Sequence, residues 1–212
     1  MLKKYFSVNA LNILIAILLI ELVFNLTLKT RVLNDQVLTN SMAERMTMDE
    51  INTLLITFKS NAFLLIFFSL LQPLIEILLT AICINTGTLL LKIQLSFKDI
   101  LEVVVKAFFV FSLTRIIFIL AFFFINVERV EDLNVVSFWS LSDWIDLTSL
   151  PTWVIYPLQY INVFQMAFVL LLAYGLNMLK VRGFNRWIGL VLSTYGIGLI
   201  ILILMISFLT AL

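Results

Sequence analysis

The sequence contains no histidine, one cysteine, three prolines and six glycines among 212 residues. Without histidine, the chain cannot form a Ser-His or Cys-His nucleophile pair, a helical H-E-x-x-H zinc site or haem ligation by imidazole. The single cysteine, Cys83, lies in an apolar run, so a disulfide within the chain is impossible and we interpret it as a small buried hydrophobe. No glycine-rich phosphate loop occurs either. We therefore expect no enzyme, no cofactor and no metal site.

Charge is also scarce, at 13% of the residues, and no lysine- or arginine-rich tract occurs, so nucleic-acid binding has no electrostatic basis. Hydrophobic residues make up 62% of the chain, and the mean hydropathy is +1.11. A soluble domain is about 45–50% apolar. Because the excess is concentrated in blocks of about 20 residues, the length that crosses a bilayer as a helix, the sequence predicts an all-α integral membrane protein.

Five such blocks predict five transmembrane helices. The first follows Lys3 and Lys4; its apolar run is too long for a signal peptide and no small-x-small cleavage site follows it, so we interpret it as an uncleaved span. We expect a single integral membrane domain over residues 1–212, with spans at approximately 6–28, 62–84, 107–126, 157–179 and 187–209. Residues 92–106 are expected to form a basic turn between the second and third spans.

The segments between spans carry two recognisable features. Thr47 and Glu50 have the spacing of a capping box, and the apolar stripe after them predicts an amphipathic helix at approximately 48–60. Residues 127–156 form an acidic loop rich in tryptophan. None of the four tryptophans falls in mid-span, which is typical of interfacial anchors. These predicted anchors are Trp139, Trp144, Trp153 and Trp187.

Charge selects the orientation of the five spans. With the N-terminus inside, eight basic residues and two acids fall on the inner side, whereas nine acids and five basic residues fall on the outer side. The positive-inside rule therefore predicts a cytoplasmic N-terminus and an extracytoplasmic C-terminus. The 48–60 helix and the 127–156 loop would then both be extracytoplasmic.

Ionisable residues inside the predicted spans are candidate site residues, because a charge in hydrocarbon is costly and usually faces a partner or a wet cavity. Glu76 and Arg115 are each eight residues from the inner end of their spans, or about 12 Å deep, which predicts an ion pair. Glu21 is expected further out, at about 22 Å. Two interpretations stay open. The pair is a structural clamp, or these residues, together with Asn162 and Gln165 in the fourth span, line a polar cavity.

The last span also carries a candidate packing surface. Gly189, Ser193 and Gly196 recur at i, i+4 and i+7, which predicts a small-residue face that allows close helix approach.

Three segments resemble the YIP family (Ypt/Rab-interacting proteins), in particular its small bacterial five-span branch: "ERMTMDEINTLLITF", "LSFKDILEVV" and "NVFQMAFVLLLAYGLNMLKVRGFNRW". The resemblance implies a multi-pass fold, without agreed catalytic residues, in the bacterial inner membrane. Eukaryotic members bind Rab-type GTPases through a long cytosolic N-terminal segment. Here only residues 1–5 precede the first span, so we expect no Rab-type partner.

Two functions from different classes are compatible with these patterns. The first is a non-enzymatic accessory or scaffold subunit of a membrane assembly, for example in protein transport or the cell envelope, with the lipid bilayer and other membrane proteins as partners. The second is a small transporter or lipid-handling protein with a polar intramembrane cavity.

Overall fold

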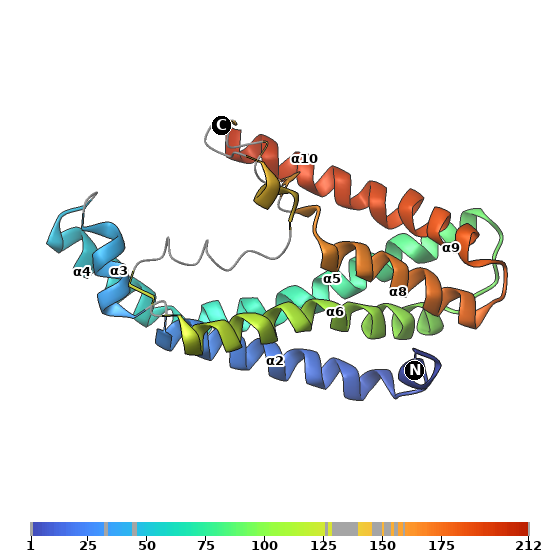
Figure 1. The fold of residues 1–212 in the computed structure, drawn as a ribbon, viewed down its shortest axis with the longest axis horizontal. Coiled ribbons are helices and arrows are strands. Elements are labelled where there is room, and N and C mark those ends of the chain that lie inside the picture. Colours follow the sequence, from blue (N-terminus) through green and yellow to red (C-terminus); the bar gives the residue numbers. More distant parts are fainter. Residues whose placement is uncertain are drawn as a thin grey trace. The chain divides into compact units, whose positions relative to one another are not determined.

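The computed structural model describes residues 2–31, 34–43, 46–125, 127–128, 140–145, 150, 154, 157–158 and 160–211. The regular structure in these ranges is helical, and one isolated antiparallel bridge joins Ser140 to Asn162. The helices, shown in Figure 1, are α1 (Leu2–Phe6), α2 (Ala10–Arg31), α3 (Asp35–Met42), α4 (Met48–Ser60), α5 (Ala62–Leu90), α6 (Phe97–Phe124), η2 (Leu141–Trp144), α8 (Val163–Leu179), α9 (Phe184–Val191), η4 (Leu192–Gly196) and α10 (Ile197–Ala211). The predicted all-α class is thus confirmed for the described part of the chain.

Within the described ranges, four helical segments are long and apolar enough to cross a membrane: Ala10–Arg31, Phe63–Leu90, Phe97–Phe124 and Phe184–Phe208. They match the first, second, third and fifth predicted spans. The fourth predicted span corresponds to α8, an apolar helix of 17 residues. Its length of about 25 Å is slightly less than the roughly 30 Å of a bilayer core. These helices are compatible with a multi-pass membrane protein.

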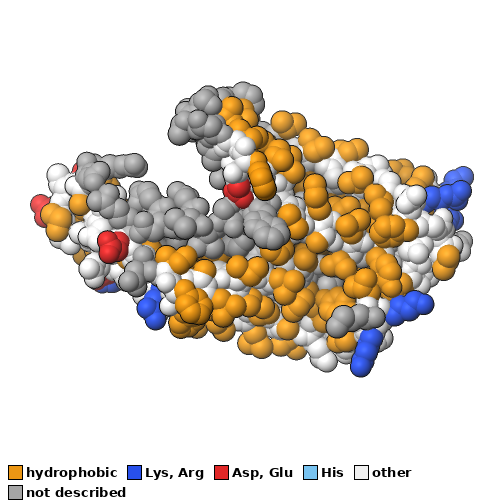
Figure 2. All heavy atoms as spheres, viewed as in Figure 1, with side chains coloured by type: hydrophobic (Ala, Val, Ile, Leu, Met, Phe, Trp, Pro, Cys, Tyr) orange, Lys and Arg blue, Asp and Glu red, His pale blue; other side chains and the backbone are white. Residues whose placement is uncertain are grey.

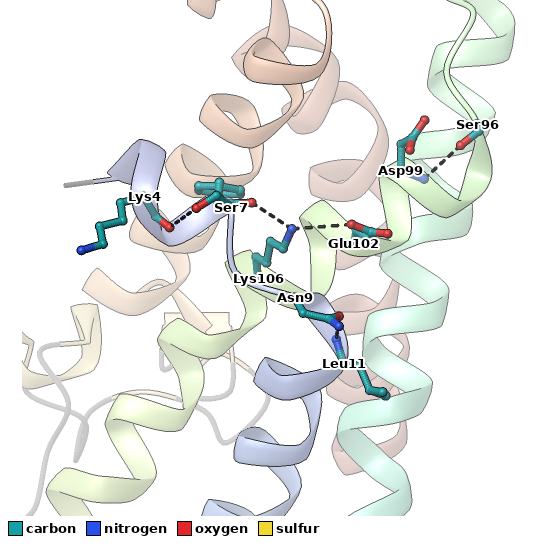
Figure 3. Close-up of polar contacts among 9 residues, drawn as sticks. Lys4, Ser7, Asn9, Leu11, Ser96, Asp99, Glu102 and Lys106 are labelled. Atoms are coloured by element: carbon teal, nitrogen blue, oxygen red, sulfur yellow. Dashed lines mark hydrogen bonds and ion pairs between the residues drawn. The ribbon is translucent and has the colours of Figure 1, made fainter.

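The link between the second and third spans is shorter than predicted. The 92–106 segment was expected to be a turn, but α6 begins at Phe97 and takes in most of it. The reason is the apolar stripe of this segment: Ile100, Val103 and Val104 are at most 4% exposed, so their burial favours helix over an exposed turn. The first turn of α6 is capped by Ser96, whose hydroxyl accepts a hydrogen bond from the Asp99 amide at 3.1 Å (Figure 3).

The contacts divide the chain into two compact units. Unit 1 contains residues 1–14, 75–111 and 137–212, and unit 2 contains residues 15–74 and 112–136. The core of unit 1 is built around α8, where Phe168, Leu172 and Leu176 are completely buried. The Phe168 ring contacts Phe108 of α6 and Tyr195 of η4, with ring centroids 6.0 and 5.3 Å away. Unit 1 therefore holds α6, α8 and the α9–η4 segment together through one aromatic cluster.

The core of unit 2 lies between α2 and the second half of α6. Phe24 and Phe122 are its buried members, with Leu28, Phe118, Ile119 and Val127 packed against them. The α3 and α4 helices also belong to unit 2, and α4 has the range predicted for the amphipathic helix.

The surface of the long helices is strongly apolar, as Figure 2 shows for the face in view. Phe63, Phe124 and Ile201 are 78%, 87% and 62% exposed. Such a dense cover of large apolar side chains is unusual on a soluble protein but suits a surface that faces lipid tails.

Candidate functional site

The centre of unit 2 contains a charged pair between two long apolar helices. The Arg115 Nε of α6 donates to the Glu21 Oε2 of α2 at 3.1 Å. The side chain of Glu21 is 11% exposed and that of Arg115 is 34% exposed. The Arg115 guanidinium also lies over the Phe24 ring, with its central carbon 4.6 Å from the ring centroid. Asn25 completes the group, because its side-chain amide donates to the Glu21 backbone carbonyl at 2.7 Å.

This geometry corrects the prediction that Glu76 is the partner of Arg115. The prediction counted Glu21 from Phe6 and Arg115 from Ala107, and both starting points were wrong. The chain turns after α1, so α2 begins at Ala10 and Glu21 is about 6 Å nearer its start than expected. The α6 helix begins ten residues before Ala107, so Arg115 is about 15 Å further along its own helix. These shifts move the two residues in opposite directions, so residue counts along the helices do not account for the pairing. It comes from the packing of α2 against the second half of α6.

The five polar residues predicted from the spans are divided between the two units. Glu21 and Arg115 belong to unit 2, whereas Glu76, Asn162 and Gln165 belong to unit 1. Glu76 is exposed on α5. Asn162 caps α8 by accepting a hydrogen bond from the Gln165 backbone amide at 2.8 Å. The Gln165 side chain donates to the Tyr195 hydroxyl at 2.7 Å. In unit 1, Asn162 and Gln165 therefore help to hold helices in place.

A pocket of about 550 Å³ opens in unit 2 beside the buried ion pair. Asn25, which contacts Glu21, is also part of its lining. One wall is aliphatic and comes from four helices: Leu28, Leu38, Leu55, Leu65 and Ile66. The sequence did not indicate this pocket, because it forms where the end of α2, α3, α4 and the start of α5 meet.

The polar wall of this pocket carries charges of both signs. Lys59 of α4 contacts Asp35 of α3 at 2.7 Å, and both side chains are more than half exposed. Lys29 lines the same pocket, and no ion-pair partner is assigned to its ammonium among the described residues. Asn34 and Gln36 add amide groups. The pocket therefore offers an aliphatic wall opposite groups that can bind both a cationic and an anionic centre.

The N-terminus of unit 1 is fastened to α6 by two reciprocal hydrogen bonds. The Tyr5 hydroxyl donates to the Lys106 carbonyl at 2.6 Å, and the Lys106 ammonium donates to the Phe6 carbonyl at 2.9 Å. Figure 3 shows the Lys106 ammonium between the Phe6 carbonyl and Glu102, whose carboxylate is 3.6 Å away. Burial raises the pKa of Tyr5 to about 12, so the phenol stays protonated and keeps donating at neutral pH. This arrangement is structural, because the Tyr5 hydroxyl and the Lys106 ammonium both donate to backbone carbonyls of the protein itself.

The predicted small-residue face of the last span does not pack closely in the described structure. Gly189 and Ser193 are exposed, and a Cβ placed on Gly189 would meet nothing within 4 Å. The Gly196 position comes close only to Leu192 of its own helix. The close approach occurs on another face, where a Cβ on Gly87 of α5 would meet the Thr194 side chain, and a Cβ on Gly198 would lie 3.4 Å from the Cys83 sulfur.

The tryptophans predicted as interfacial anchors differ in their surroundings. Trp144 is 84% exposed, as an anchor would be. Trp187 is near the start of its helix but is only 1% exposed, and its indole donates to the Lys180 carbonyl at 3.0 Å. Trp187 therefore packs inside unit 1 instead of reaching the headgroup layer. Trp139, Trp153 and most of the 127–156 loop lie outside the described residues.

Among the described residues, no group of three or more Cys, Asp or Glu side chains is placed to hold a metal ion. The pocket in unit 2 offers groups for apolar contact, ion pairing and hydrogen bonds. Comparison of the chain with family models, with curated proteins and with solved structures finds no match.

Proposed function

We propose that the chain is a non-enzymatic five-span membrane protein whose pocket in unit 2 binds a zwitterionic lipid headgroup. The observation that carries the proposal is this pocket of about 550 Å³, which lies within the usual range for small-molecule sites. Its aliphatic wall suits the upper part of an acyl chain. A phosphate would pair with Lys29, and an amine would replace Lys59 as the partner of Asp35.

The neighbouring ion pair supports binding because it holds Asn25, one residue of the pocket lining, in place. Asn25 lines the pocket and donates to Glu21, which is held by Arg115. A preformed site costs less conformational entropy when it binds its ligand. The structural-clamp interpretation of Arg115 and the lipid-handling function are therefore compatible.

The orientation and the location are parts of the same proposal. The pocket is formed by α3, α4 and the adjoining helix ends, which the charge distribution assigns to the extracytoplasmic side of a bacterial inner membrane. The ligand would be drawn from the outer leaflet of that membrane. Membership of the YIP family is compatible with this assignment and rests on the sequence resemblance alone.

The test is a titration of the purified full chain with dihexanoyl phosphatidylethanolamine in a non-ionic detergent. We expect saturable binding, and we expect Lys29→Gln to weaken it about fivefold, the factor for one lost ion contact of about 1 kcal/mol. Leu55→Trp should block the aliphatic wall. Arg31→Gln is the matched control, because it removes the same charge from the end of α2 at a residue outside the pocket. Equal affinity in the wild type, Lys29→Gln and Leu55→Trp would refute the proposal.

The accessory or scaffold role remains a prediction from the sequence. The small-residue face on which it relied has an exposed glycine and serine, but nothing in the described structure identifies a protein partner for it. Extraction in a gentle detergent followed by mass spectrometry tests this role, and a chain that always purifies alone would argue strongly against it.

A further inference from the structure

A second concave surface lies in unit 1. Its charged lining residues are all basic, whereas the pocket of unit 2 carries charges of both signs. It is a groove of about 320 Å³ between the turn that follows α5 and the start of α9. Leu91 and Ile93 form part of its apolar wall, and Arg182 and Arg186 also line it. Figure 2 shows Lys and Arg side chains in separate groups at the end of unit 1 that carries the α8–α9 turn.

The charge around this groove is of one sign. Arg182 and Arg186 are both exposed, and neither guanidinium has an ion-pair partner within the described ranges. The sequence from Lys180 to Leu212 contains no aspartate or glutamate. Two exposed guanidinium groups therefore line an apolar groove with no acidic side chain from the same segment to neutralise them.

The shape of the groove is fixed by its own walls. Trp187 is 1% exposed and donates to the Lys180 carbonyl, so the segment that carries both arginines is tied back to the end of α8. Gly183 adopts a φ of +95°, a conformation that glycine reaches without strain, and so permits this turn. The space over Gly189 is empty to at least 4 Å. The groove is therefore open and already formed along the first turns of α9.

We propose that this groove binds an anionic phospholipid. Each guanidinium can make paired hydrogen bonds to phosphate oxygens, and the apolar wall takes the first part of an acyl chain. The groove is at the start of a helix long enough to cross the membrane, which is where lipid headgroups lie. A packed helix would fill the space over Gly189 but would leave both arginines without a counter-charge.

The experiment compares two lipids on the purified full chain by native mass spectrometry. Both samples carry Leu55→Trp, which blocks the pocket of unit 2, because phosphatidylcholine is zwitterionic and would otherwise bind there. Phosphatidylglycerol is added to one sample and phosphatidylcholine to the other, at equal concentration. We expect one retained phosphatidylglycerol in excess of phosphatidylcholine. The Arg182→Gln/Arg186→Gln variant should lose about thirtyfold in apparent affinity, the factor for two basic contacts with an anionic lipid.

Three further variants keep the test decisive if the double variant folds poorly. Gly189→Leu places a side chain in the groove from a position where its Cβ meets nothing within 4 Å, so it should reduce binding with both arginines present. Gly196→Leu is its matched control, because Gly196 is on the same transmembrane segment but outside the groove. Lys98→Gln is the charge control, since Lys98 is exposed and also outside the groove.

Equal retention of the two lipids by the Leu55→Trp protein would overturn the proposal, as would unchanged phosphatidylglycerol binding when Gly189→Leu is added. Copurification of a second copy or another helix in place of lipid, abolished by Gly189→Leu, would also overturn it. The outcome is independent of the pocket in unit 2, because Leu55→Trp blocks that pocket in every sample and the groove variants lie in unit 1.

Discussion

At the scale of single residues, the Glu21 carboxylate is a costly feature, because it lies on an apolar helix with 11% of its side chain exposed. It is tolerated because three neighbours compensate it: the Arg115 guanidinium, the Asn25 amide and, through Arg115, the Phe24 ring. A buried pair of this kind adds little net stability when it is intact, but removing one partner strands the other charge.

The first prediction rests on this asymmetry. Arg115→Leu should destabilise the protein by about 3 kcal/mol, because it leaves the Glu21 carboxylate buried without a partner. The Glu21→Leu/Arg115→Leu double variant should lose less, since no charge remains to be buried. Thermal unfolding in detergent measures both, and a double variant less stable than Arg115→Leu alone would contradict the clamp.

The identity of this pair shows where sequence reasoning stops. The residue types were sufficient to predict that Arg115 has a carboxylate partner inside the bundle. The choice between Glu21 and Glu76 depended on which helix packs against the second half of α6, and in the structure this is α2. Residue counts along each span give depth only, so they do not identify the neighbouring helix.

At the scale of elements, local signals were the most reliable. The Thr47–Glu50 spacing predicted a capping box, and the Glu50 carboxylate accepts from the Thr47 backbone amide at 2.8 Å and from its hydroxyl at 2.9 Å. These two hydrogen bonds lower the pKa of Glu50. The box needs only four consecutive residues, so the sequence holds all the information that forms it.

Helix packing was predicted less well, because it depends on which face of the helix each residue occupies. The sequence identified small residues on the last span, but Leu192–Gly196 is a π-helical turn. A π turn takes in one more residue than an α turn, which shifts the faces after it by about 100° relative to a regular helix. A stripe counted at i, i+4 and i+7 therefore does not stay on one face, and Thr194 and Gly198 meet α5 instead.

The second prediction tests that contact. Gly87→Val should destabilise the protein by about 1–3 kcal/mol, because the new side chain overlaps Thr194 and forces α5 away from its neighbour. Gly189→Val is the matched control, since it makes the same change in a helix at an open position. Thermal unfolding of the two variants should therefore differ clearly, and equal losses would show that Gly87 is not a packing site.

At the scale of the whole molecule, composition alone was sufficient to predict the class of protein. Blocks of apolar residues predicted helices of spanning length, and four of them are present within the described residues. The fourth block was predicted as a span at 157–179, whereas α8 has only 17 residues, near the lower limit for a span. Whether α8 crosses decides whether the C-terminus is inside or outside.

The third prediction tests whether α8 crosses the membrane by measuring the accessibility of introduced cysteines. The variants are made in a Cys83→Ser background, which removes the single native cysteine. Met48→Cys and Val181→Cys place reporters at positions that are 61% and 85% exposed. With five spans, a membrane-impermeant maleimide added to intact cells should label Met48→Cys but not Val181→Cys. If α8 does not cross, Val181→Cys should also be labelled. Leu91→Cys, at 59% exposure, is inside on both arrangements and is the negative control.

The π-helical turn has a further consequence for how this chain can change in length. A π turn is an α-helix that has absorbed one additional residue, so removing a residue there restores a regular helix and leaves α10 facing the same way. Deletion of Ser193, which is exposed, should therefore be tolerated. The same deletion in a regular stretch of the helix would rotate every later residue by about 100°. Leu192–Gly196 is thus the natural position for a single-residue gap between this sequence and any relatives of different length.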